Sequence, residues 1–181
     1  KVGAKITRTL DTFLSSPLFQ DLERSDPTAW LTVDPGPNAG LEQPVVDGVA
    51  LWAIPDFARR MEDGRCEVWD WKTGRPGPAD EVQLLAYGLY AHQIWGFAPE
   101  DIHLAAFYLD PDKADERLIV PFTFNEAQLG RVTRIIREDI DAMRQLLIDP
   151  ELGEAKPIEA FPMTEFEKHC TRCSFKEICK R

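Results

Sequence analysis

Apolar and polar residues recur along this chain with two different periods. Apolar residues three or four positions apart predict helices, which cover 6–22, 80–95 and a long segment after residue 125. Apolar runs and two-residue alternation predict strands, which cover 45–54, 66–72, 102–109 and 118–124. We expect Pro17 to kink or end the first helix, and Asp80 and Asn125 to cap the second and third. The order helix, strands, helix, strands, helix predicts an α/β fold with a mixed β-sheet flanked by helices.

The strand predicted over 66–72 separates polar chemistry from apolar packing. Side chains of a strand alternate between the two faces of a sheet, so Asp70 and Lys72 share one face. Trp69 and Trp71 then point to the other face, where a core accommodates them. A carboxylate binds a metal ion, and an ammonium group beside it steers a water molecule or a phosphate. This pair is the first candidate for chemistry.

A second acid, Asp47, lies in the strand predicted over 45–54. Two acids and a lysine on neighbouring strands are the layout of a metal-dependent site that cleaves phosphodiesters. If Asp47 lies opposite Asp70, Leu51 lies opposite Cys66. The two strands are then joined by a loop of about ten residues that starts near Pro55, which is longer than usual.

Composition limits the class of protein. With 181 residues the chain is expected to form one domain over 1–181, with a cysteine-rich tail over 163–181. The net charge of −10 argues against a broad electrostatic grip on nucleic acid, although bound cations and a local basic groove offset such a charge. The sequence shows neither an apolar run of membrane-spanning length nor a signal peptide, so we expect a cytoplasmic location and no membrane partner.

Three of the four cysteines cluster near the end of the chain, at Cys170, Cys173 and Cys179. This clustering favours a metal centre over a disulfide scaffold. An iron–sulfur cluster takes four thiolates, so the fourth ligand comes from sequence outside the chain or from Cys66, which is otherwise a small core residue. A zinc site with His169 is the alternative, although His169 directly precedes Cys170; free thiols are the third possibility.

Together these motifs resemble the RecB-like branch of the PD-(D/E)XK nuclease superfamily. The matching elements are Val46-Asp47-Gly48-Val49, Asp70-Trp71-Lys72 with Thr73-Gly74, and Gln83-Leu84-Leu85-Ala86-Tyr87 as the Q-x-x-x-Y motif. The cysteine tail resembles the iron–sulfur tail of AddB-type nucleases and CRISPR-adaptation exonucleases. The resemblance runs from about Glu42 to Cys179 and implies a restriction-endonuclease-like core.

The resemblance also implies roles for individual residues. Asp47, Asp70 and the Trp71 carbonyl would bind Mg²⁺ or Mn²⁺, and Lys72 would orient or help deprotonate the attacking water. Gln83 and Tyr87, one turn apart on a helix, would hold Lys72 and a DNA phosphate. Asp56, in a literal Pro-Asp dipeptide, is a second candidate for the first acid. Asp47 is preferred because it lies among apolar strand neighbours, whereas Pro55 indicates a strand end.

The implied activity is DNA cleavage, on single strands or free ends, in repair, recombination or defence. A 4Fe-4S cluster and a helicase or CRISPR-adaptation partner are implied with it. The family usually has an upstream helix with a His or Glu near the metals and an upstream Cys, yet no His precedes His92 and no Cys precedes Cys66. We therefore expect the chain to begin after part of that segment. The alternative class is a catalytically silent DNA- or protein-binding module.

Overall fold

A computed structural model describes residues 2–33, 42–110, 118–162, 165 and 167–177. The chain divides into two compact units, Lys1–Arg137 and Glu138–Arg181. The first unit contains the main sheet, the helices that cover it and the residues of the candidate site. No helix in the described ranges is both long and apolar enough to cross a bilayer.

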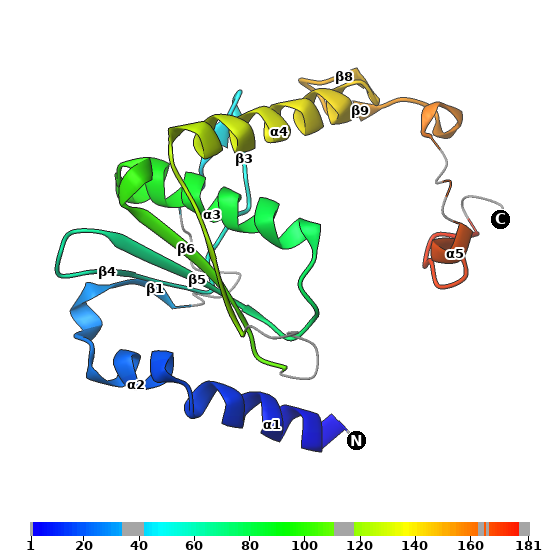
Figure 1. The fold of residues 1–181 in the computed structure, drawn as a ribbon. Helices are drawn as coiled ribbons and strands as arrows, with labels where there is room; N and C mark the ends of the chain where they lie inside the picture. The colour runs from blue at the N-terminus through cyan, green and yellow to red at the C-terminus, as the bar shows by residue number, and fades with distance from the viewer. Residues whose placement is uncertain (1, 34–41, 111–117, 163–164, 166, 178–181) are drawn as a thin grey trace. The chain divides into compact units, whose positions relative to one another are not determined.

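A five-stranded mixed sheet forms the centre of the first unit (Figure 1). Its strands, in spatial order, are β1 (Trp30–Val33), β4 (Phe57–Arg60), β5 (Cys66–Lys72), β6 (Ile102–Tyr108) and β7 (Ile119–Phe122). β5 and β6 are parallel, and the other neighbouring pairs are antiparallel. The three strands predicted beyond residue 65 are confirmed to within two residues at their ends, and so is the mixed sheet.

Two short helices pack on one face of this sheet. α1 (Val2–Leu14) and α2 (Pro17–Arg24) replace the single helix expected over 6–22, because Pro17 begins a new helix. Ser16 caps that helix by accepting a hydrogen bond from the Phe19 amide at 3.1 Å. Leu18 and Leu22 of α2 pack into a core cluster with Phe57, Trp69, Ala105 and Phe107 of the sheet.

The opposite face is covered by α3 (Pro78–Trp95), which joins the parallel strands β5 and β6 (Figure 1). A parallel pair needs such a crossover connection. The Asp80 carboxylate accepts a hydrogen bond from the Gly77 amide at 2.8 Å, so Asp80 helps to cap the helix as expected. α4 (Glu126–Arg144) is capped by Asn125, whose Oδ1 accepts from the Gln128 amide at 3.0 Å. In the sequence, the 3-10 helix η2 (Pro99–Asp101) follows α3 and leads into β6.

The structure corrects the prediction before residue 65. The segment 45–54 is not one strand: β2 (Val45–Val46) and β3 (Val49–Ala50) form a separate hairpin around Asp47-Gly48. Both turn residues have positive φ, 48° and 80°, which is the geometry that Asp-Gly favours in two-residue hairpins. The loop predicted to begin near Pro55 contains β4, and β1, with the preceding η1 (Pro27–Ala29), was not predicted.

The second unit is small. It contains the end of α4, the hairpin of β8 (Leu147–Asp149) and β9 (Glu154–Ala155), η3 (Ile158–Ala160) and α5 (Glu167–Cys170). The Lys156 amide donates to the Leu146 carbonyl at 2.9 Å beside this hairpin.

Candidate active site

Asp70 and Lys72 lie side by side near the end of β5. Lys72 Nζ is 2.7 Å from Asp70 Oδ2, which confirms that alternation places both on the α3 face of the sheet. Trp69 belongs to the core cluster on the opposite face, and Trp71 packs against that cluster, as predicted. The same strand therefore holds a polar pair and an aromatic anchor on its two sides.

Burial determines the electrostatics of Asp70. The residue is 2% exposed, and burial raises the pKa of its carboxyl group above the ordinary value, while the Lys72 ammonium opposes that shift. Its Oδ2 atom makes the ion pair with Lys72 but has no partner at hydrogen-bond geometry. A second cation at this oxygen would offset the cost of burying the charge.

Helix α3 fixes the lysine through the Q-x-x-x-Y residues. Lys72 Nζ donates to Gln83 Oε1 at 2.5 Å, and Gln83 Nε2 donates to Tyr87 Oη at 2.6 Å. Tyr87 is 5% exposed, and burial raises the pKa of its hydroxyl group, so the group stays protonated at neutral pH. The structure thus brings together four of the residues that the sequence singled out: Asp70, Lys72, Gln83 and Tyr87.

Asp80 is a neighbour of Lys72 that sequence reasoning had used only as a helix cap. Its Oδ1 atom is 3.7 Å from Lys72 Nζ, and its Oδ2 atom accepts a hydrogen bond from the Tyr108 hydroxyl at 2.8 Å. Tyr108 of β6 lies in register beside Lys72. The signal in the sequence was the position of Asp80, one turn before Gln83 on the same helix.

Asp56 is bound directly to the backbone of this motif. Asp56 Oδ2 accepts a hydrogen bond from the Trp71 amide at 2.7 Å, and the residue directly precedes β4. Because β4 pairs with β5 through Phe57 and Trp69, Asp56 lies beside the backbone that links Asp70 to Lys72.

The register predicted for Asp47 is wrong. Cys66 pairs with Arg60 rather than with Leu51, and Asp47 lies in the β2–β3 turn outside the five-stranded sheet. The Asp47 carboxylate receives hydrogen bonds from Arg137 of α4, at 2.6 Å from Nε and 3.1 Å from Nη2. The Asp-Gly turn is the physical cause, because it reverses the chain just where the prediction needed a continuous strand.

Comparison with protein families identifies the superfamily of this chain. The sequence profile of the PD-(D/E)XK nuclease superfamily matches residues 6–180. The chain belongs to the PD-(D/E)XK nuclease superfamily. Its mixed sheet flanked by helices is consistent with the restriction-endonuclease-like fold. A search of curated proteins finds no match.

PD-(D/E)XK nucleases generally use Mg²⁺ or Mn²⁺, and the residues present fit such an ion. Asp56 and Asp70 would supply carboxylate oxygens and Trp71 a backbone carbonyl, the hard oxygen donors that these cations prefer. The burial of the Asp70 carboxylate supports the fit, because its Oδ2 atom has the Lys72 ammonium as an ion-pair partner but no partner at hydrogen-bond geometry. Among the described residues, no three His, Cys, Asp or Glu side chains gather as a metal-binding group, so the fit rests on two carboxylates.

The cysteines give a mixed picture. Cys66 is fully buried, and burial raises the pKa of its thiol to about 12, which confirms the expected core residue. In the second unit the Cys173 amide donates to the Cys170 carbonyl at 3.3 Å, and Cys173 Sγ accepts from the Phe175 amide at 3.4 Å. Cys179 and the side chain of His169 lie outside the described residues, so the cluster stays a prediction.

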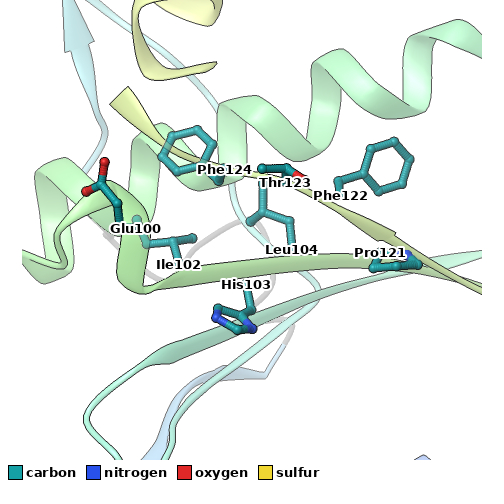
Figure 2. A pocket seen from close by; sticks show the side chains of 8 residues that line it. All are labelled: Glu100, Ile102, His103, Leu104, Pro121, Phe122, Thr123 and Phe124. Carbon is teal, nitrogen blue, oxygen red and sulfur yellow. The ribbon is translucent and has the colours of Figure 1, made fainter. Parts of the chain in front are cut away.

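A cavity of about 340 Å³ at the start of β6 is lined by none of the candidate active-site residues (Figure 2). It is lined by Ile102, Leu104 and Phe124, among others, and His103 points away from Leu104 across the strand. In the parallel register Ile102 lies beside Cys66, at the end of β5 opposite to Lys72. His103 contacts Arg65 at 3.2 Å, consistent with the structural role expected of it.

Proposed function

We propose that this protein is a metal-dependent deoxyribonuclease that hydrolyses phosphodiester bonds. The observation that carries the proposal is the ion pair of the buried Asp70 with Lys72, with Asp56 hydrogen-bonded to the intervening Trp71 amide, in a chain of the PD-(D/E)XK superfamily. Asp56, Asp70 and the Trp71 carbonyl would hold Mg²⁺ or Mn²⁺. When bound, the ion polarises a phosphoryl oxygen and makes bound water a better nucleophile.

Lys72 acts on the water or the phosphate beside this ion. Its ammonium group has three donors and is held by Asp70 and Gln83, with Asp80 nearby. An ammonium fixed in this way offers a donor to a phosphate oxygen without first having to be ordered, which lowers the entropic cost of the transition state. Gln83 and Tyr87 are positioning residues, since they reach the substrate through Lys72 in this geometry.

The finer assignment follows the motifs. We place the chain in the RecB-like branch, because Gln83 and Tyr87 occupy one face of α3 with Gln83 bonded to Lys72. Within that branch we propose single-stranded DNA or free ends as substrate, in repair, recombination or defence, with a helicase or CRISPR-adaptation protein as partner. The tail residues Cys170, Cys173 and Cys179 would hold a 4Fe-4S cluster as a structural clamp, with Zn²⁺ as the alternative.

The colour of the protein tests the tail. Anaerobically purified full-length protein is expected to be brown and to lose its visible absorbance in Cys170→Ser and Cys173→Ser variants. The buried Cys66 provides the control, because Cys66→Ala should leave the colour unchanged. A colourless protein that contains zinc would reverse the assignment.

Cleavage of end-labelled single- and double-stranded DNA tests the main proposal. We expect cutting with Mg²⁺ or Mn²⁺, and a loss of about 10²-fold or more in Asp70→Asn and Lys72→Met. Asp63→Asn is a matched control, since Asp63 forms a surface ion pair with Arg65 on the β4–β5 hairpin. Activity that survives both site substitutions contradicts the mechanism.

A catalytically silent binding module is the second candidate. The net charge of −10 favours its protein-binding form, because that charge opposes DNA binding wherever cations do not offset it. Absence of cleavage by the wild type on every substrate would support this module over the nuclease.

A further inference from the structure

A second cavity lies next to Asp56, on the sheet face opposite to Lys72. Its volume is about 500 Å³, and its walls are mainly apolar. Aromatic rings from five elements line it: Phe13 of α1, Phe19 of α2, Trp30 of β1, Phe57 of β4 and Trp71 of β5. Asp56 is among the lining residues, so the cavity and the candidate metal site share a side chain.

The aromatic walls are held in place before any ligand binds. Trp30 Nε1 donates to Ser25 Oγ at 2.9 Å, and the Trp30 ring meets Phe57 edge to face at 5.5 Å. Phe13 meets Trp71 edge to face at 5.3 Å. Rings fixed by their neighbours lose little conformational freedom when a planar ligand stacks on them, so such a wall favours binding.

Trp71 connects the cavity to the chemistry. Its side chain lines the cavity, its amide is bound by Asp56, and its neighbours along the strand are Asp70 and Lys72. Asp56 precedes β4 beside the end of β5, so a phosphate bound next to Asp56 would lie at the end of the sheet that the cavity adjoins. The acidic chain offers little attraction to a phosphate backbone, so an apolar contact to the base is a complementary source of affinity.

We propose that this cavity binds one unpaired base of the substrate strand next to the scissile phosphate. The proposal rests on the proposed nuclease function and narrows its substrate to DNA with at least one unstacked nucleotide. A base inside a duplex cannot reach an aromatic pocket without leaving its stack, whereas a single strand presents its bases freely. Stacking on fixed rings is sequence-tolerant, because every base has an aromatic face.

An abasic scan tests this pocket. A short fluorescent single strand is bound to the full-length Asp70→Asn protein with Mg²⁺, and one base at a time is removed while the backbone is kept. We expect one position at which loss of the base weakens binding about tenfold, and small effects elsewhere. Because this contribution comes from stacking, the ratio of the affinity for the intact strand to that for the abasic strand should stay constant as NaCl is raised. Both affinities should fall.

A tryptophan pair supplies the matched variants. Trp30→Leu keeps an apolar side chain but removes the stacking face, and should weaken binding of the intact strand about tenfold without affecting the strand that lacks the pocket base. Trp95→Leu is the control, because Trp95 is also half-buried with one edge-to-face partner, Tyr90 at 4.9 Å, but lies at the far end of α3. If Trp30→Leu does not fold, Phe19→Leu provides the same test.

The outcomes separate this proposal from the nuclease itself. A flat abasic scan, or a Trp30→Leu effect equal on intact and abasic strands, overturns the pocket even if the wild type cleaves DNA. A positive scan together with a wild type that never cleaves supports the pocket and contradicts the nuclease. In that case the base site belongs to a binding module.

Discussion

At the scale of single residues, the structure places Asp56, and not Asp47, beside the Asp70–Lys72 motif, and we propose Asp56 as the first acid. Both acids follow apolar residues, and sequence alone favoured Asp47. The difference lies in the partner of each carboxylate: Asp47 binds the Arg137 side chain, whereas Asp56 binds the Trp71 amide within the Asp70–Lys72 motif. An acid bound to that amide is in place to share an ion with Asp70.

Paired substitutions at the two acids test this assignment. Asp56→Ala should reduce metal-dependent cleavage by about 10²-fold or more, because it removes one of two carboxylates from the candidate site. Asp47→Ala should change the cleavage rate by less than about threefold. It should lower stability modestly, because the exposed ion pair contributes about 0–1 kcal/mol and Ala is less favourable than Asp at the positive φ of this turn position. Rates are measured on the same end-labelled strand. The reverse order of effects would restore Asp47 as the first acid.

At the scale of elements, α3 depends on a close contact at Gly88. A Cβ atom at this position would lie 2.5 Å from Cε2 of Phe124, whose side chain is 4% exposed and therefore has little space to move. Gly88 therefore lowers the helix propensity of α3 but allows the close packing of Phe124 against it.

Two glycine-to-alanine variants provide a test with opposite signs. Gly88→Ala should destabilise the protein by about 1–3 kcal/mol, because overpacking outweighs the better helix propensity of alanine. Gly130→Ala in α4 should stabilise it by roughly 0.5–1 kcal/mol, since no atom lies within 4 Å of the added Cβ. Chemical denaturation measures both. A stabilising Gly88→Ala would show that Phe124 moves aside freely.

An ion pair between helices gives the fold a pH-dependent contribution. Arg131 of α4 donates to Glu81 of α3 at 2.6 Å and 3.2 Å, and this hydrogen bonding lowers the pKa of Glu81 below 4.5. A carboxyl group whose pKa is lower in the folded state stabilises the fold at pH values above its ordinary, unfolded-state pKa. This stabilisation is lost as the pH falls through the folded-state pKa.

Glu81→Gln should therefore lower the melting temperature near neutral pH and have a diminishing effect as the solution is acidified below 4.5. Arg131→Gln should show the same pH trend, because it removes the other partner. Thermal unfolding at several pH values measures both. A destabilisation by Glu81→Gln that grows towards acid pH would contradict the assignment.

At the scale of the whole molecule, a net charge of −10 makes nucleic-acid binding depend on cations. The two candidate metal carboxylates add to this charge where a phosphate has to approach. Removal of divalent metal with EDTA should abolish cleavage and weaken oligonucleotide binding.

In EDTA the double variant Asp56→Asn/Asp70→Asn should bind a single strand several-fold more tightly than the wild type, because two repulsive charges are gone. With Mg²⁺ the order should reverse, since the wild type then holds the ion. Fluorescence anisotropy measures both conditions. Equal binding by the two proteins in EDTA would show that the carboxylates do not face the phosphate.

Local patterns were sufficient for the later half of the first unit. Alternation placed Asp70 and Lys72 on one face of β5, and helical spacing placed Gln83 and Tyr87 on one face of α3. Strand and helix periods are properties of consecutive residues, so the sequence carries them directly. The strand β4 escaped this reasoning because its polar Arg59 is buried, bound to Asp21 of α2 and Glu67 of β5.

The sequence by itself determined the class of fold, the D-x-K strand and the helix that holds its lysine. Only the tertiary structure decided which acid lies beside that strand and where the aromatic cavity lies. Both depend on contacts between distant segments: the register of β4 on β5, and the packing of α1, α2 and β1 at the core cluster. Register is set by turns and by buried ion pairs whose partners are far apart in the chain, and no local period encodes them.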